Sequence, residues 1–121
     1  MRRDRVFMQS DARQFLYDVA RAAEAIRRFT HARTLHNYEE DLMLRSACER
    51  QFEIIGEAMT RLRDQHRDVF DNVTEGHAII AFRNRLIHGY ESVDSTMVWD
   101  VIEHELADLE LVAQRLLSER E

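Results

Sequence analysis

The residues from Arg83 to Tyr90 combine side chains that can act on a phosphodiester. Arg83 offers a planar guanidinium that can donate two hydrogen bonds to phosphate oxygens. His88 can give and take a proton near neutral pH, as general acid–base catalysis requires. The hydroxyl of Tyr90 can donate a hydrogen bond to a phosphate. This spacing is compatible with a site that cleaves a phosphodiester bond.

Arg83 has an unusual position on the helix that the periodicity predicts over residues 77–89. On a wheel of about 100° per residue, it lies inside an apolar arc. The members of this arc are Ile79, Ile80, Phe82, Leu86 and Ile87. A charge there is costly unless it is paired or lines a polar cavity. Asn84 and His88, one turn apart, form a polar strip beside the arc.

Two interpretations of Arg83 remain open on spacing alone. In the structural interpretation, Arg83 makes a buried ion pair with Glu53 or Glu57 of the preceding helix. His88 would then complement the dipole at the C-terminal end of its own helix. In the catalytic interpretation, Arg83 and His88 act on a phosphodiester, and Arg83 lines a polar cavity.

The elements that must position these residues are helical. The chain has 121 residues, enough for one domain, with no proline and three glycines, which favours a few long helices over a sheet. Apolar residues recur at helical spacing over 10–29, 39–65, 77–89 and 95–119, and 67–73 reads as a short helical turn. Ser10 is the expected N-cap of the first helix, and Asp94 or Ser95 that of the last. We expect an all-α, four- to five-helix bundle in a single domain, residues 1–121.

The apolar stripe of the first predicted helix extends to Phe29, and that of the second includes Cys48, which we expect to be a core thiol. A lone cysteine excludes an intrachain disulfide and fits a reducing cytoplasm. No apolar run is long enough for a membrane span or a signal peptide. We therefore expect a cytoplasmic protein with no membrane contact.

Several classes of site are excluded by pattern. No histidine follows an acidic residue by three positions, as the di-iron sites of helix bundles require, and no glycine-rich nucleotide loop occurs. We therefore expect neither a metal nor a cofactor. Five histidines are interpreted as surface or capping residues: His31, His36, His66, His77 and His104. The net charge of −6 is not that of a general nucleic-acid binder, so any RNA would bind in a local arginine-lined cleft.

Three segments resemble one protein family. Arg83-x4-His88-x-Tyr90 matches the R-x4-H-x-Y signature of HEPN domains, and residues 82–90 resemble its HepT branch. Residues 52–58 are similar to the Ile-Gly-Glu-Ala segment of the second helix in that family, and residues 93–99 to the start of its last helix. Over residues 10–118, the chain resembles HepT-like HEPN ribonuclease toxins.

The resemblance implies a metal-independent endoribonuclease that acts on RNA, with tRNA as the usual target. Arg83 would stabilise charge on the phosphorane, and His88 would transfer protons. Asn84 would orient His88 or the ribose, and Tyr90 would bind the phosphate. In the family, two protomers face each other across one cleft, so a homodimer is expected. The usual partner is a minimal nucleotidyltransferase antitoxin that can adenylylate the motif tyrosine, here Tyr90.

A second function is compatible with the same fold. Some HEPN domains are non-catalytic modules that bind nucleotide or substrate for a nucleotidyltransferase partner, or act as helical adaptors. Such a module does not need the complete set of Arg83, His88 and Tyr90. Because the set is intact, the ribonuclease interpretation is favoured.

Overall fold

The computed structural model describes residues 9–88 and 94–119. Over these residues the chain forms seven helices and no strand. They are α2 (Ser10–Thr30), α3 (Leu35–Glu40), α4 (Leu42–Gln65), α5 (Arg67–Phe70), α6 (Gly76–His88), α7 (Ser95–His104) and α8 (Leu106–Ser118). The prediction of an all-α helical bundle is confirmed.

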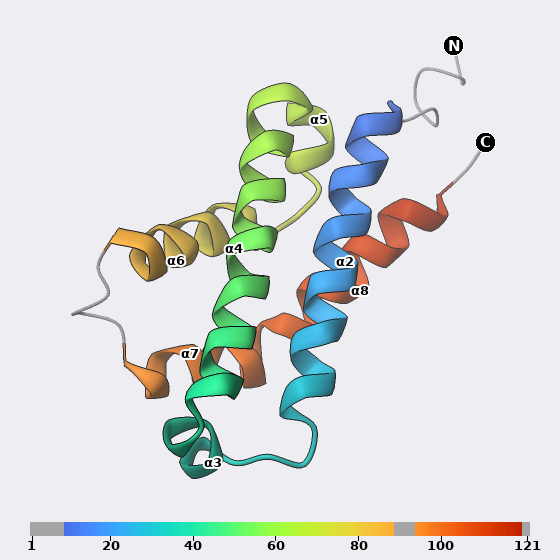
Figure 1. Ribbon diagram of the computed structural model, residues 1–121. Coiled ribbons are helices and arrows are strands. Elements are labelled where there is room, and N and C mark those ends of the chain that lie inside the picture. The colour runs from blue at the N-terminus through green and yellow to red at the C-terminus, as the bar shows by residue number, and fades with distance from the viewer. Residues whose placement is uncertain (1–8, 89–93, 120–121) are drawn as a thin grey trace.

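The bundle is built around α4, which has α2 on one side and α6 on the other (Figure 1). α2 also packs against α8, and the short α3 lies at the end of the bundle against α7. The fully buried side chains that fill the core come mainly from α2, α4 and α8: Leu16, Val19, Ile26, Phe52, Ile55, Met59, Leu62, Leu106 and Leu109. Burial of these apolar side chains is the main source of stability.

Two of the predicted helices are each interrupted once. The segment expected as one helix over 39–65 contains the end of α3 and all of α4, separated by Asp41. Asp41 is extended, and its carboxylate accepts a hydrogen bond from the Leu44 amide, which caps α4. The segment expected over 95–119 breaks at Glu105 into α7 and α8. Apolar residues keep helical spacing through Glu105, which is why the pattern predicted one helix there, whereas the stripe of the 39–65 segment begins only at Leu44, after Asp41.

The predicted helix ends are partly confirmed. Asp94 caps α7 by accepting a hydrogen bond from the Met97 amide, as expected. Ser10 is not the N-cap of α2, because it is the first helical residue and Gln9 stands before it without a side-chain cap. Phe29 is also wrong as a core residue, since it is 38% exposed near the end of α2, where Thr30 turns inward instead.

Cys48 lies in the core, as predicted. Burial raises the pKa of its thiol to about 12, which leaves it protonated and poorly reactive at neutral pH. Tyr38 falls between the helices predicted over 10–29 and 39–65, but it lies in α3 and is fully buried beside Trp99, with ring centroids 5.6 Å apart. His36 also belongs to α3 rather than to a connection.

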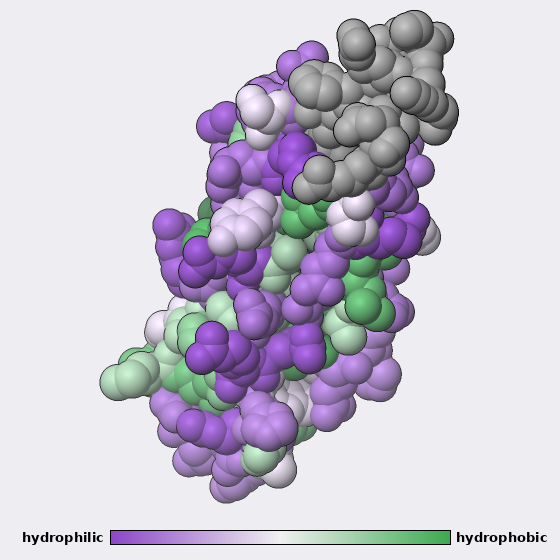
Figure 2. All heavy atoms as spheres, turned by 90° about the vertical axis from the view of Figure 1, so that its right-hand side faces the viewer, coloured by the Kyte–Doolittle hydropathy of each residue, from purple (hydrophilic) through white to green (hydrophobic). Residues whose placement is uncertain are grey.

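The face of the bundle drawn in Figure 2 is mainly polar. Figure 2 shows the side of the bundle that lies to the right in Figure 1, and its hydrophobic residues form small separate patches. Across the described ranges, no helix combines the length and the apolar character needed to cross a membrane.

Candidate active site

The helix α6 is anchored by three buried residues, Ile79, Ile80 and Phe82. Phe82 meets Phe52 of α4 edge to face, with ring centroids 5.0 Å apart. Aromatic pairs in this geometry add about 0.5–1.5 kcal/mol beyond their buried area. This anchoring fixes the rotation of α6, and so the direction of Arg83.

Arg83 lies on the side of α6 that faces α4, as the wheel predicted. Only 21% of its side chain is exposed. Its aliphatic part passes directly over Gly56 of α4, where a Cβ atom would come within 2.2 Å of Arg83 Cγ and 2.4 Å of Arg83 Cβ. These atoms are close to the backbone of α6, so a side chain at position 56 would force the two helices apart. Because Gly56 has no side chain, the aliphatic part of Arg83 can lie across the surface of α4 at this point.

The guanidinium of Arg83 is held by polar contacts beyond Gly56. Its Nη2 donates to Oε1 of Glu57 at 3.2 Å, and its Nη1 lies 3.4 Å from Oδ1 of Asn84. The second oxygen of Glu57 accepts a hydrogen bond from Nε of Arg61 at 3.0 Å. One carboxylate thus binds two guanidinium groups.

These contacts decide part of the structural interpretation. The ion pair between Arg83 and Glu57 is confirmed, whereas Glu53 pairs with Arg50 instead. The expectation that the pair would be buried is wrong, because 51% of the Glu57 side chain is exposed. The aliphatic part of Arg83 packs against α4 within the apolar arc, but its guanidinium lies at the surface, beside Glu57.

Arg83 lines a groove with a volume of about 400 Å³. Residues of three helices line it: Phe15 and Asp18 of α2; Arg50, Glu53, Ile54, Glu57, Ala58 and Arg61 of α4; and Arg83 of α6. The groove is therefore a polar cavity of the kind that a charge on an apolar arc requires.

Asn84 and His88 follow Arg83 on the outer surface of α6. Both side chains are exposed, and His88 is the last residue of the helix. That position is compatible both with a capping role and with proton transfer to a bound ligand. Tyr90, the fourth predicted site residue, lies outside the described residues.

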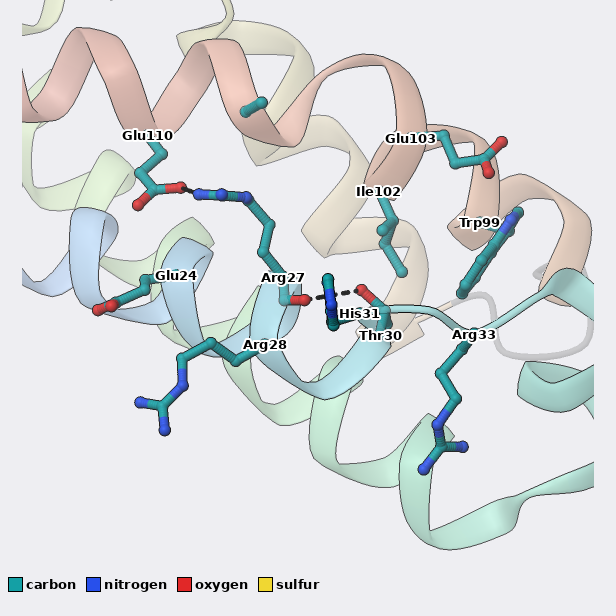
Figure 3. A pocket seen from close by; sticks show the side chains of 11 residues that line it. Glu24, Arg27, Arg28, Thr30, His31, Arg33, Trp99, Ile102, Glu103 and Glu110 are labelled. Carbon is teal, nitrogen blue, oxygen red and sulfur yellow. Dashed lines mark hydrogen bonds and ion pairs between the residues drawn. The ribbon is translucent and has the colours of Figure 1, made fainter.

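A larger hollow, of about 500 Å³, lies between the C-terminal end of α2 and the helices α7 and α8 (Figure 3). There Arg27 forms an ion pair with the buried Glu110. The side chains of Arg28 and Arg33 point away from Arg27 and do not converge (Figure 3). No predicted site residue lines this hollow.

Two of the histidines outside the motif make contacts within the fold. His66 ends α4, and its Nε2 lies 3.0 Å from Oδ1 of Asp11. His77 meets the ring of Phe70 edge to face. Within the described part of the chain, no three histidine, cysteine or acidic side chains gather as a metal site would need.

Sequence reasoning missed the parts of the site that lie on α4 and α2. Glu57 was predicted as a possible partner of Arg83, but Gly56 stood out only as part of a family segment, Phe15 only as part of an apolar stripe, and Arg61 had no predicted role. The signal for Gly56 was a glycine in the interior of a long helix, where it costs about 1 kcal/mol relative to alanine and so requires a packing reason.

Comparisons with known proteins agree with this architecture. The model of a family described as "Ribonuclease HepT-like" matches residues 19–116. "Putative RNase MJ1380" of Methanocaldococcus jannaschii is 31% identical over 96 residues, which cover 79% of this chain and 87% of that protein. "Probable ribonuclease HepT" of Thermococcus cleftensis is 26% identical over 102 residues, 84% of this chain and 92% of that protein. The comparison with solved structures found no match.

Proposed function

Because the chain belongs to the HepT-like ribonuclease family, we propose that it is a metal-independent endoribonuclease whose site is formed by Arg83, Asn84, His88 and Tyr90. The expected substrate is RNA, with tRNA as the first candidate. The observation that carries this proposal is the course of Arg83, which crosses α4 over Gly56 and presents its guanidinium to a polar groove. An adaptor helix would have no need to bring an arginine through its packed face.

The proposed reaction uses the nucleophile that RNA carries. The 2′-hydroxyl loses its proton to a base and attacks the adjacent phosphorus, and the bond from phosphorus to the 5′-oxygen breaks. The leaving 5′-oxygen takes a proton from an acid, so the products end in a 2′,3′-cyclic phosphate and a 5′-hydroxyl. His88 is the proton-transfer group, Arg83 stabilises the charge on the phosphorane, and Asn84 orients His88 or the ribose.

Incubation of the purified protein with total RNA in excess EDTA tests this proposal. We expect cleavage to continue at an unchanged rate, because the chemistry uses only protein side chains and the substrate hydroxyl. A rate that falls to background with EDTA and recovers with Mg²⁺ or Mn²⁺ would overturn the metal-independent mechanism.

The motif supplies one histidine per chain, whereas this route works best with both a base and an acid. We therefore propose an isologous homodimer in which the two copies of α6 face each other and each contributes a His88. Among the described residues, α6 packs mainly on α4 (Figure 1), and His88 is exposed at its end, where we expect the second copy to pack. Light scattering at micromolar concentration should give about twice the chain mass. A monomer that cleaves RNA at the full rate would contradict the composite site.

Regulation by a partner enzyme follows from the same family. We expect a cognate minimal nucleotidyltransferase to act as the antitoxin and to adenylylate Tyr90. The added phosphodiester would compete with the substrate for Arg83 and block the site. With that partner and ATP, mass spectrometry should find AMP on the peptide that contains Tyr90, and Tyr90→Phe should remove it.

The other two tyrosines serve as controls of different quality. Tyr17 is 47% exposed on α2 and is therefore a fair competitor for modification. Tyr38 is fully buried, and its burial raises the pKa of the hydroxyl, so it should not react in the folded protein. AMP found on Tyr17 alone would contradict the assignment to Tyr90.

A further inference from the structure

The groove beside Arg83 contains two residues that the proposed chemistry does not use, Arg61 and Phe15. The Cζ atom of Arg61 lies 5.9 Å from the centre of the Phe15 ring, within the range of a cation–π interaction. Arg61 belongs to α4 and Phe15 to α2, so the pair spans the groove between these helices. Arg61 is half exposed and Phe15 half-buried.

The charges that line the groove balance overall, with three arginines and three acidic residues, so any excess of positive charge is local. Glu57 accepts hydrogen bonds from both Arg61 and Arg83, so the three groups together carry one uncompensated positive charge. The other acidic residues of the groove make separate contacts. Glu53 pairs with Arg50, and Asp18, on the α2 side, accepts a hydrogen bond from Gln14 at 2.9 Å. Asp18 keeps its negative charge on the α2 side, so a ligand with a negative charge is favoured only beside Arg61 and Arg83.

Single-stranded RNA fits this combination of groups. Its phosphates pair with arginine, and its unstacked bases stack on aromatic or guanidinium planes. Arg61 and Arg83 are separated by a single carboxylate, so a strand that places one phosphate on Arg83 brings its neighbouring phosphate toward Arg61. The Phe15 ring, 5.9 Å from the Cζ atom of Arg61, lines the same groove and offers an aromatic face to that neighbouring nucleotide.

We propose that Arg61 and Phe15 form a subsite for the nucleotide next to the cleaved bond, in which Arg61 binds its phosphate and Phe15 stacks on its base. This inference rests on the proposed ribonuclease function, and it adds a direction in which the substrate strand runs, from Arg83 along α4. Glu57 is the positioning residue that holds both guanidinium groups before RNA arrives.

The subsite is tested by binding of a short, fluorescently labelled 2′-O-methyl oligoribonucleotide, which cannot be cleaved. Arg61→Gln should weaken binding roughly tenfold. It should also reduce the slope of log Kd against log salt by about 0.7, the share of one single-strand phosphate contact. Arg61→Lys keeps the charge and should keep the slope.

The stacking half of the subsite has its own variant. Phe15→Leu preserves an apolar side chain but removes the ring, and it should weaken binding roughly tenfold without a change in the salt slope. The matched control is Phe29→Leu, because Phe29 lies on the same helix, is also partly exposed and does not line the groove.

Arg67→Gln is the matched control for Arg61→Gln. Nε of Arg67 contacts Asp71 at 3.0 Å, and its Cζ lies 5.6 Å from the centre of the Phe70 ring, as in the pair of Arg61 with Glu57 and Phe15. Arg67 does not line the groove that Arg83 enters. Its replacement removes the same charge and the same kind of contacts, and it should leave affinity and salt slope unchanged.

The outcomes separate this inference from the function on which it rests. If the wild type cleaves RNA but Arg61→Gln and Phe15→Leu bind like their controls, the subsite is wrong and the ribonuclease proposal stands. If the wild type cleaves no RNA but the two variants still lose affinity relative to their controls, Arg61 and Phe15 bind RNA, but the ribonuclease proposal fails and with it the place of this subsite beside a cleaved bond.

Discussion

Replacement of His88 by alanine should reduce RNA cleavage by roughly 10²–10⁴-fold, the usual contribution of general acid–base catalysis. His88 is exposed at the last turn of α6, so its removal should leave helical content and thermal stability unchanged. Cleavage rates under single-turnover conditions, together with circular dichroism, measure both quantities. An active His88→Ala variant would remove this residue from the mechanism.

Arg83→Ala should lose roughly 10²–10³-fold in rate, as expected when a donor to the developing charge is removed. The fold should survive, because Glu57 is half exposed and remains paired with Arg61. Arg83→Lys is the sharper variant, since it keeps the charge and the aliphatic part over Gly56 but lacks the bidentate fork. Unfolding of both variants would instead support a purely structural Arg83.

Another large effect is expected at Gly56, a residue that touches no substrate. Gly56→Ala places a Cβ atom 2.2 Å from Arg83 Cγ, so α6 must move away from α4. Misplacement of a catalytic group by about 1 Å can cost 10²-fold in rate, and we expect a loss of roughly that size. The free energy of unfolding should change little. Overpacking costs about 1–3 kcal/mol, but alanine is favoured over glycine inside a helix by about 1 kcal/mol.

A double-mutant cycle on stability provides the control for Gly56. In the Arg83→Ala background, the Cγ and Cδ atoms that crowd the new methyl group are absent, and only the Cβ atom at 2.4 Å remains. Gly56→Ala should therefore cost less free energy of unfolding in that background than in the wild type. Equal costs in the two backgrounds would show that the close approach of Arg83 to Gly56 does not govern the packing of α6.

Much of the fold could be predicted from the sequence because it depends on local periodicity. The bounds expected for the helix over 10–29 and for the motif helix agree with α2 and α6 to within a residue at each described end. The break at Glu105 was not predicted because the apolar stripe continues through it. The break at Asp41 was missed although Asp41 is a residue type that often caps helices, as it does at the start of α4. Phe29 is a similar case. The apolar stripe of α2 does not show at which residue the neighbouring helices stop covering it.

The site was predictable only in part, for a related reason. The wheel correctly placed Arg83 on the apolar arc of its helix, a property of α6 alone. Its passage over Gly56, its shared carboxylate and its groove depend on how α6 crosses α4, which no short segment specifies. Glu53 and Glu57 were equivalent in the sequence, and only this crossing selects Glu57.

We propose that the protein cleaves RNA through the 2′-hydroxyl next to the broken bond. The most direct measurement is mass spectrometry of the fragments from an oligoribonucleotide, beside the same oligonucleotide with one 2′-deoxyribose at the cleaved position. We predict fragments that end in a 2′,3′-cyclic phosphate from the first and no cleavage at the modified position of the second. Equal cleavage of both, or fragments with 5′-phosphate ends, would contradict the mechanism.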